Sequence, residues 1–242
     1  MVDFHTHVLP GIDDGAESPE VSLGMLLESA DQGVDTLVFT PHFYADEQDL
    51  ISFLNDRADA VYQLKDALRL ARKEKPEECT RLAGMRFFAG AEVYYFPSLS
   101  TCEEIRKLSF GKAKLLLVEP PVMRWTGSMI DEIENTGYNL GLTPVVAHLD
   151  RYMRMLGDFS LPELLEGRDI LTQVNASFFT RPETVETARG MLAGGAIDII
   201  GSDCHNTDSR PQNIGYAAGV LRERGLASAL DELTEYSNSL LY

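Results

Sequence analysis

Short apolar runs alternate with longer amphipathic stretches along all 242 residues of the chain. Seven of these runs have the residue types and the length that are typical of strands buried on both faces. We predict strands at "VDFH" (2–5), "DTLVFT" (35–40), "MRFFAGAEVYYF" (85–96), "KAKLLLVE" (112–119), "GLTPVVAH" (141–148), "DILTQVN" (169–175) and "AIDIIGSD" (196–203).

Helical patterns follow the predicted strands. A first helix should open at Ser18 and Pro19, because serine can cap free amide groups and proline suits a first helical turn. Further amphipathic patterns cover Glu47 to Lys75, 126–137 and 181–193. Alternating strands and helices predict repeated βα units around a parallel sheet. When such βα units close into a barrel, the functional residues lie at the C-terminal ends of the strands.

The composition agrees with one globular domain. Apolar residues make up 44% of the chain, and no Pro/Gly/Ser-rich linker divides it, so we expect a single barrel-like domain over residues 1–242. Three cysteines without framework spacing indicate reduced thiols and a cytoplasmic location. No segment approaches the roughly 20 apolar residues of a membrane helix, and no signal peptide is recognisable. We therefore expect a soluble protein without membrane insertion.

The charge balance restricts the class of partner. The chain has 21 basic and 38 acidic residues, which gives a formal net charge of −17. Such a surface repels phosphate backbones unless a basic patch interrupts it, so nucleic acid is not an expected partner. Most of the acidic residues are interpreted as a solvated surface.

The histidines have an uneven distribution. A single histidine is more often a core or surface residue than a metal ligand. Here, however, all five histidines fall at the ends of four predicted strands, and a shared metal site explains them jointly. They are His5, His7, His42, His148 and His205.

Four carboxylates accompany the histidines. Glu92 and Glu119 lie on or beside apolar strands, where an unpaired charge would be costly, so each needs either a metal or a buried basic partner. Asp203 precedes His205 by two residues, a spacing that puts both side chains on the same side of an extended backbone. Asp14, in "DDG", is either a turn residue or a ligand.

Several spaced motifs carry a family resemblance. "DFHTH", "TPH", "GAEVYY", "LLLVE", "VVAHLDRY" and "SDCHN" resemble the successive motifs of the polymerase and histidinol phosphatase (PHP) superfamily of metal-dependent phosphoesterases. More narrowly, "FHTHVLPGIDDGAES", "GAEVYY", "TPVVAHLDRY", "QVNAS" and "SDCHNTDSRP" are similar to bacterial tyrosine-protein phosphatases of capsule and exopolysaccharide biosynthesis. The resemblance runs from residue 2 to about residue 215.

The resemblance implies a fold and a metal centre. The fold would be a distorted (β/α)7, TIM-like barrel, the PHP fold, with three divalent metal ions, often manganese. One ion would be held by His5, His7, Glu92 and Asp203, a second by Glu92, Glu119 and His148, and the third by Asp14, His42 and His205. Arg151 and Arg210 correspond to arginines that are expected to bind the substrate phosphate.

The implied chemistry is consistent with these residue types. Metal coordination lowers the pKa of bound water toward neutrality, so a metal-activated hydroxide is expected to attack phosphorus. The metal ions and the two arginines would stabilise the transition-state charge. Phenolate is a fair leaving group, with a parent pKa of about 10, and no residue obviously supplies a general acid. Mixed imidazole and carboxylate ligands also suit iron or zinc.

The resemblance also implies the substrate. It would be a phosphotyrosine protein, in particular a membrane-bound tyrosine autokinase of capsule or exopolysaccharide biosynthesis. A recessed metal centre favours phosphotyrosine over phosphoserine, because the longer side chain carries its phosphate farther from the backbone. Tyr94, Tyr95 and Tyr152 are expected near the rim, where their rings could pack on the substrate, although tyrosines in a strand are more often core residues.

Other functions remain open at this point. "CHNTDSR", from Cys204 to Arg210, matches the C-x5-R spacing of cysteine-dependent phosphatases, but the bulky and acidic residues between them suit a phosphate loop poorly. A histidinol-phosphate or other small-molecule PHP phosphatase would use the same ligands. A non-enzymatic metal-binding scaffold would have no use for Arg151 and Arg210. An amidohydrolase would usually need a further lysine or histidine.

Overall fold

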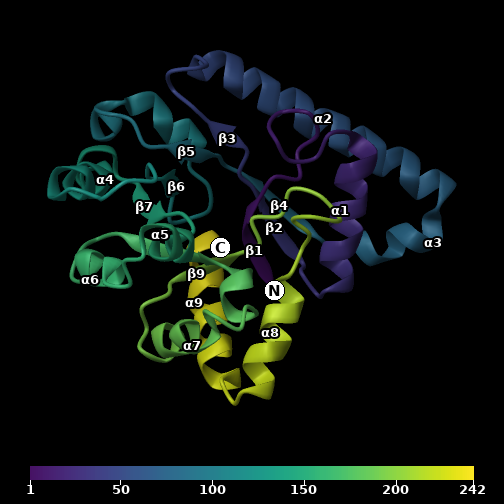
Figure 1. Ribbon diagram of the computed structural model, residues 1–242. Coiled ribbons are helices and arrows are strands. Elements are labelled where there is room, and N and C mark those ends of the chain that lie inside the picture. The colour runs from purple at the N-terminus through teal and green to yellow at the C-terminus, as the bar shows by residue number, and fades with distance from the viewer.

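Parallel strands form the centre of the computed structural model, which describes residues 1–242, and helices surround them (Figure 1). The strands are β1 (Val2–Thr6), β2 (Thr36–Phe39), β3 (His42–Phe43), β4 (Arg86–Ala89), β5 (Glu92–Tyr94), β6 (Leu115–Glu119), β7 (Thr143–Val146), β8 (Leu171–Asn175) and β9 (Ile199–Gly201). The helices are α1 (Pro19–Asp31), α2 (Leu50–Glu74), α3 (Pro76–Cys79), α4 (Gly127–Leu140), α5 (Leu149–Leu156), α6 (Leu161–Leu165), α7 (Val185–Ala193), α8 (Ile214–Glu223) and α9 (Ala227–Leu241). Short 3₁₀ segments are η1 (Thr80–Leu82), η2 (Leu99–Thr101), η3 (Glu103–Leu108) and η4 (Ala176–Phe179).

The strands form two parallel sheets that adjoin each other at both edges. Their orders are β1-β2-β4 and β3-β5-β6-β7-β8-β9. The amide of Gly90 donates to the carbonyl of Phe39 (2.8 Å) and continues the pairing of β2 with β4 toward β3 and β5. At the other edge the residues after β9 pair with β1, since the amide of Asp203 donates to the carbonyl of His5 (2.9 Å). The first and last strands of the chain therefore lie next to each other.

The predicted strands match the structure with one division. Seven of the nine strands lie inside the seven predicted runs, β1 extends one residue past the first run to Thr6, and β3 lies just after the second run. The predicted strand 85–96 is interrupted and becomes β4 and β5. A Cβ atom on Gly90 would lie 2.4 Å from the Phe110 ring, so the chain passes this ring at a position that only glycine allows. The neighbouring strand breaks at Pro41, which has no amide to donate.

Helix starts follow the capping chemistry. The Ser18 hydroxyl accepts a hydrogen bond from the amide of Val21 (3.4 Å), and α1 begins at Pro19, as predicted. Helix α2 begins at Leu50, three residues later than the predicted Glu47, because Asp49 caps it: Asp49 Oδ1 accepts from the amides of two residues in the first turn (both 3.0 Å). None of the helices is both long enough and apolar enough to cross a membrane.

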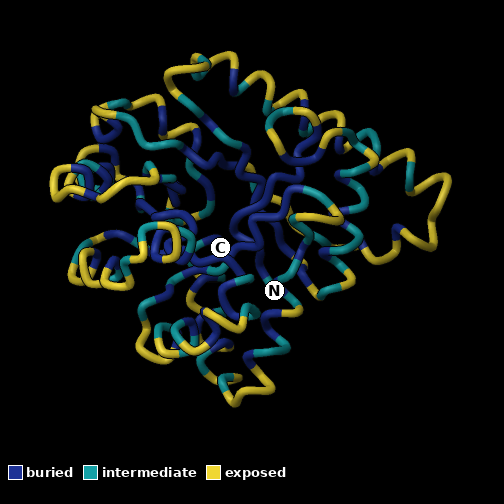
Figure 2. Tube along the Cα trace, viewed as in Figure 1, coloured by how far each residue is buried: buried dark blue, intermediate teal, exposed yellow.

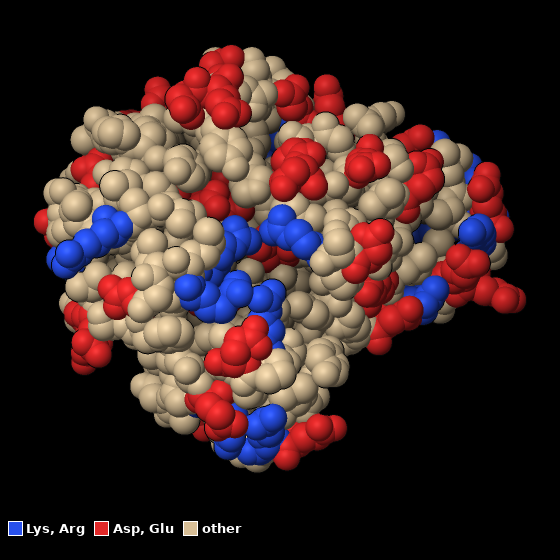
Figure 3. Space-filling model, viewed as in Figure 1, with Lys and Arg blue, Asp and Glu red and all other residues tan.

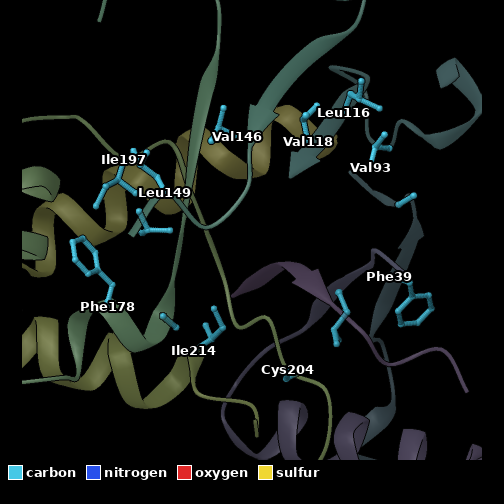
Figure 4. Close-up of a cluster of buried hydrophobic side chains, with 14 of the residues drawn as sticks. Phe39, Val93, Leu116, Val118, Val146, Leu149, Phe178, Ile197, Cys204 and Ile214 are labelled. Atoms are coloured by element: carbon cyan, nitrogen blue, oxygen red, sulfur yellow. The ribbon is translucent and has the colours of Figure 1, made fainter. Parts of the chain in front are cut away.

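The core lies between the strands and the surrounding helices. Figure 2 shows most of the strands buried and the outer faces of the helices exposed, while β4 is largely exposed. Figure 4 shows part of the main cluster, in which side chains from strands, such as Val93 and Val146, lie with helix residues such as Ile214. Leu115 and Leu117, which alternate with Leu116 and Val118 along β6, belong to a second, smaller cluster. This alternation gives β6 two buried faces.

Register places the acidic residues on the second of these faces. Val93 of β5 is the register partner of Val118 of β6, and Glu92 is the partner of Leu117. Glu92 and Leu117 therefore share the face opposite to the main cluster, and Glu119, two residues after Leu117, follows on the same face. Two carboxylates are thus directed into the space that the sheet encloses.

Gly201 of β9 packs closely against His5 and Gln173, which border the enclosed space. A Cβ atom on Gly201 would lie 2.5 Å from the His5 Cβ and 3.0 Å from Gln173 Nε2. We predict that Gly201→Ala lowers the free energy of unfolding of the metal-free protein by about 1–3 kcal/mol, because it overpacks the site. Gly219→Ala on α8 is the matched control, since nothing lies within 4 Å of its added Cβ. Urea unfolding compares the two, and equal stability of both variants would contradict the packing argument.

Candidate metal centre

The nine predicted ligands gather at one end of the parallel strands. His5 lies on β1, Glu92 on β5 and Glu119 at the end of β6, while the other residues lie at a strand start or in the loop after a strand. Six of the nine are almost completely buried: His5, His7, Glu92, His148, Asp203 and His205. The remaining three, His42, Glu119 and Asp14, form the more open edge, with Asp14 the most exposed at 64%.

Four imidazoles surround the Glu92 carboxylate. Its Oε2 lies 3.0 Å from His5 Nε2, 3.3 Å from His7 Nε2 and 3.1 Å from His42 Nδ1. Its Oε1 lies 2.8 Å from His148 Nε2. One buried acidic side chain therefore lies at the centre of the cluster.

A second group forms around Asp14. Its Oδ1 lies 3.4 Å from His42 Nε2 and 3.3 Å from His205 Nε2. The rings of His7 and His205 stack with centroids 3.9 Å apart. On the other side of Glu92, His148 Nε2 lies 3.4 Å from Glu119 Oε1. The cluster thus extends from the exposed Asp14 through Glu92 to Glu119.

The donor set fits divalent cations. Ligand atoms within 4.8 Å of one another occur in three sets: His7, Asp14, His42 and His205; His5, His7 and Glu92; His42, Glu92 and Glu119. Within these sets, His42 Nδ1 and His205 Nε2 are buried without a hydrogen-bond partner. The Nε2 atoms of His5 and His7 lie only 3.1 Å apart. Buried imidazole nitrogens that face carboxylates at such distances are a suitable environment for metal ions.

Comparison with the implied ligand sets shows agreement and two differences. His148 belongs to none of the three sets, and His42 occurs in its place with Glu92 and Glu119, although His148 Nε2 lies 2.8 Å from Glu92 Oε1 and 3.4 Å from Glu119 Oε1. Asp14, His42 and His205 occur together, and His5 and His7 occur together with Glu92. Asp203 is the second difference, because its carboxylate is engaged by arginines and lies 3.6 Å from the Nε2 atoms of both His5 and His7. The assignment of all nine residues as ligands stays a prediction.

Carboxylates hold protons on some of the imidazoles. Burial alone would lower the pKa of His7, but its hydrogen bonds to Asp13 and Glu92 outweigh burial and raise the pKa to about 10. Burial likewise opposes protonation of His148, yet Glu119 and Glu92 raise its pKa to about 9. Burial lowers the pKa of His205 to about 4. Metal ions that bind here must displace protons, so binding should release protons to solvent.

Two site residues have a left-handed backbone. His148 has φ 32° and Asp203 has φ 58°, a region that disfavours side chains with a Cβ. Both are held by hydrogen bonds. The amide of His148 donates to Gln173 Oε1 (2.6 Å), and the amide of Asp203 donates to the carbonyl of His5 (2.9 Å). The neighbouring strands therefore fix the direction in which these side chains point.

Sequence reasoning did not identify the residues that orient the ligands. Asp13 Oδ2 lies 2.8 Å from His7 Nδ1 and accepts a hydrogen bond from the amide of His42 (3.1 Å). The pair of acids in "DDG" signals a site, but the family resemblance indicates only Asp14 as a ligand. Gln173, in the "QVNAS" motif, places its Oε1 3.2 Å from His5 Nδ1. Asn175 in the same motif donates from Nδ2 to Asp203 Oδ2 (3.0 Å).

Two guanidinium groups lie at the edge of the centre. Arg210 donates to Asp203 Oδ1 (2.9 Å), and its other nitrogen lies 3.7 Å from Asp14 Oδ2. Arg151 donates to Asp203 Oδ2 and lies 3.7 Å from Glu119 Oε1. Both side chains remain partly exposed, at 27% for Arg151 and 39% for Arg210. They can therefore reach an anion at the mouth of the site.

The C-x5-R segment has no phosphate loop. Cys204 is completely buried, and burial raises its pKa well above the ordinary value, which disfavours the thiolate. Asn206 Oδ1 accepts the amides of Asp208 (3.1 Å), Ser209 (2.8 Å) and Arg210 (2.9 Å). The amides that would bind phosphate in a cysteine-dependent enzyme are thus occupied by a side chain of the same loop.

The rim tyrosines divide into core and surface residues. Tyr152 is fully buried, packs against Trp125 and donates to the carbonyl of Pro120, so it is a core residue that no substrate ring can reach. Tyr94 is half-buried, and its ring lies 5.5 Å from that of Tyr44. Tyr44 in turn stacks 5.4 Å from His42. Tyr95, also partly buried, packs against the main core.

This parallel α/β fold, with a cluster of imidazoles and carboxylates at the C-terminal strand ends, defines a class of metal-binding α/β proteins. A sequence model of the family described as capsular polysaccharide synthesis, CpsB/CapC, matches residues 1–240. The chain belongs to this family.

Named relatives and a solved structure are similar over nearly the whole chain. The tyrosine-protein phosphatase CpsB of Streptococcus pneumoniae is 26% identical over 96% of this chain and 94% of its own length. The tyrosine-protein phosphatase YwqE of Bacillus subtilis is 26% identical over 100% of this chain and 91% of its own length. A structure from work on YwqE and CpsB, described as unique metal-dependent tyrosine phosphatases, has a TM-score of 0.80 at 23% identity and covers 100% of this chain and 94% of the other. The structural likeness supports the fold.

The position of Asp13 leads to a prediction about metal affinity. Asp13→Asn should weaken metal binding by about 10- to 100-fold, because the carboxylate that orients His7 is lost while the ligands remain. Metal content after dialysis against a graded metal buffer measures the change. Asp59→Asn, an exposed acidic residue on α2, is the control and should leave metal content unchanged. If both variants bound metal with equal affinity, the proposed role of Asp13 in metal binding would be wrong.

Proposed function

We propose that this chain is a metal-dependent protein-tyrosine phosphatase. The observation that carries the proposal is the juxtaposition of two partly exposed guanidinium groups with a buried cluster of imidazoles and carboxylates. A metal-storage or scaffold protein would not need cationic side chains next to its ligands. Hydrolysis of a phosphate ester, in contrast, uses metal ligands to hold the ions and cationic side chains to bind the phosphate. Relatives named tyrosine-protein phosphatase over nearly the whole chain support the same conclusion.

The cofactor in this proposal is three divalent ions, with manganese favoured and iron or zinc as the alternatives. The ligands would be His5, His7, Asp14, His42, Glu92, Glu119, His148, Asp203 and His205. Bound ions would act as Lewis acids and lower the pKa of water toward neutrality, which supplies the nucleophile at physiological pH. The partly buried, mixed imidazole and carboxylate donor set supports this cofactor.

The chain's own groups bind the phosphate and the ring. Arg151 and Arg210 match the oxygens of a phosphate dianion and stabilise the charge that develops on them. The neighbouring rings of Tyr44, which stacks on His42, and Tyr94 provide an aromatic surface for the substrate ring. No acidic side chain needs to protonate the leaving group, because phenolate leaves readily.

The depth of the centre supports phosphotyrosine as the substrate. His5 and His148 are fully buried and Glu92 is 1% exposed, whereas Asp14 and Arg210 form an accessible edge. A long side chain can pass this edge while the protein that carries it stays outside. A short phosphoserine side chain brings its own backbone against the rim. The proposed partner is a phosphotyrosine protein, in particular a membrane-bound tyrosine kinase of capsule or exopolysaccharide biosynthesis, in the cytoplasm.

The fold and domain assignment belong to the same proposal. Taking β2 with β3 and β4 with β5 as interrupted single strands, the sheet has the seven βα positions of a distorted (β/α)7 barrel. Residues 1–242 would form one PHP phosphoesterase domain. The pairing of the residues after β9 with β1 supports closure of the barrel.

A substrate and metal test decides the proposal. The metal-loaded protein should hydrolyse phosphotyrosine peptides at least about tenfold faster in kcat/KM than matched phosphoserine peptides, and chelation should remove the activity because the nucleophile depends on metal. Malachite-green phosphate release is the measurement. Cys204→Ser is the thiol control and should keep activity. Retention of activity after chelation, or its loss in Cys204→Ser with metal content intact, would overturn the metal mechanism. A strong preference for histidinol phosphate would overturn the tyrosine assignment.

Substitution of the two arginines tests phosphate binding separately from metal binding. Arg151→Ala and Arg210→Ala should each reduce kcat/KM by about 10²- to 10³-fold, since each removes a donor to the transition-state charge. Metal content, measured by inductively coupled plasma spectrometry, should stay at the wild-type value because guanidinium groups are not metal ligands. Arg151→Lys tests geometry, because it keeps the charge without the paired donors. Normal turnover of both alanine variants would exclude the arginines from the site.

A further inference from the structure

Two further arginines lie beside the centre, in a cavity of about 170 Å³ next to Asp203. The cavity is lined by polar side chains and Pro211, and four of its lining residues are arginines: Arg151, Arg154, Arg181 and Arg210. Figure 3 shows basic side chains gathered near the middle of this face, around a hollow in which acidic side chains are visible. This concentration of positive charge occurs on a chain whose formal net charge is −17.

The four arginines differ in how their charge is balanced. Arg151 and Arg210 are paired with Asp203 and with the neighbouring acidic ligands. The guanidinium groups of Arg154 and Arg181 make no hydrogen bond or ion pair anywhere in the structure, and both are at least partly exposed. Like charges that share one small cavity repel each other over the Debye length of about 8–10 Å unless an anion lies between them. Two of the four positive charges in the cavity therefore have no acidic partner.

Ordered backbone holds both unpaired arginines. Arg154 lies three residues after Arg151 on α5, so the two side chains extend from neighbouring positions of one helix face. The amide of Arg181 donates to the carbonyl of Ser177 (3.2 Å), and the carbonyl of Arg181 accepts from the amide of Val185 at the start of α7 (3.0 Å). The backbone of each arginine is therefore held in place, while its guanidinium group remains without a partner.

We propose that Arg154 and Arg181 form a second anion-binding subsite, which binds an acidic group on the same peptide as the target phosphotyrosine. The proposal rests on the proposed function, since Arg151 and Arg210 are then occupied by the phosphate that is hydrolysed. The cavity volume of about 170 Å³ is more than ten times the roughly 10–15 Å³ that one water molecule requires, so the cavity accommodates one carboxylate or one phosphate group. The subsite makes the enzyme selective for phosphotyrosine in an acidic sequence.

Three peptides test the subsite. They share one phosphotyrosine and carry glutamine, glutamate or phosphoserine at the flanking positions, so that charge changes while size stays similar between glutamine and glutamate. We expect kcat/KM for the glutamate peptide to exceed that for the glutamine peptide by about fivefold, the effect of one partly exposed ion pair. The phosphoserine peptide decides the source of the anion: a larger preference assigns the subsite to a second phosphate, and an equal one shows that a carboxylate suffices.

The variants are Arg154→Gln, Arg181→Gln and the double substitution. In the double variant the ratio of kcat/KM between the glutamate and glutamine peptides should fall to about one. This ratio is insensitive to a loss of folded or metal-loaded enzyme, because such a loss lowers both values equally. Arg106→Gln is the matched control, since Arg106 is an exposed arginine on η3 without an ion pair, and it should keep the wild-type ratio.

The outcomes separate the two proposals. If the wild-type protein hydrolyses the three peptides with equal kcat/KM, or if the double variant keeps the preference, the subsite is wrong and the phosphatase function stands. If the metal-loaded protein hydrolyses none of the peptides, the proposed function itself is wrong.

Discussion

The convergence of four imidazoles on the Glu92 carboxylate is the interaction on which the rest of the site depends. Glu92 is 1% exposed and lies within 3.3 Å of nitrogens from His5, His7, His42 and His148. A buried carboxylate is costly unless positive charge compensates it. In the metal-free protein, protons on histidines supply that charge, and metal ions would replace them. Cation binding is therefore coupled to release of these protons.

This convergence requires an interrupted sheet. Glu92 reaches the centre because the chain breaks at Gly90 and resumes as β5 in register with β3 and β6. The other side of the centre depends on the last strand, since the residues after β9 pair with β1 and direct Asp203 toward His5 and His7. The left-handed backbone at Asp203 and His148 is tolerated because neighbouring strands fix it with hydrogen bonds. Strand closure thus orients ligands that lie some 200 residues apart in the sequence.

Charge is divided unevenly around the centre. On one side, the cavity beside Asp14 and His42 is lined by acidic side chains and Tyr44. On the other side, Arg151, Arg154, Arg181 and Arg210 line a polar cavity next to Asp203. In the proposed function, a phosphate ester between the two cavities would have cationic groups on one flank, and acidic side chains with Tyr44 on the other. This asymmetry would favour one orientation of the proposed substrate.

The sequence by itself determined the strand positions, the start of α1 and the grouping of histidines at strand ends, because periodicity and capping act within a few residues. It also indicated the acidic residues on apolar strands, since burial of a charge is visible from its neighbours along the chain. Only the tertiary structure decided that Asp13 orients His7, that Tyr152 and Cys204 are inaccessible, and that Arg154 and Arg181 join the two arginines at the centre. These relations connect residues on different elements. Their distances follow from strand register and from the closure of the sheet, which no local pattern specifies.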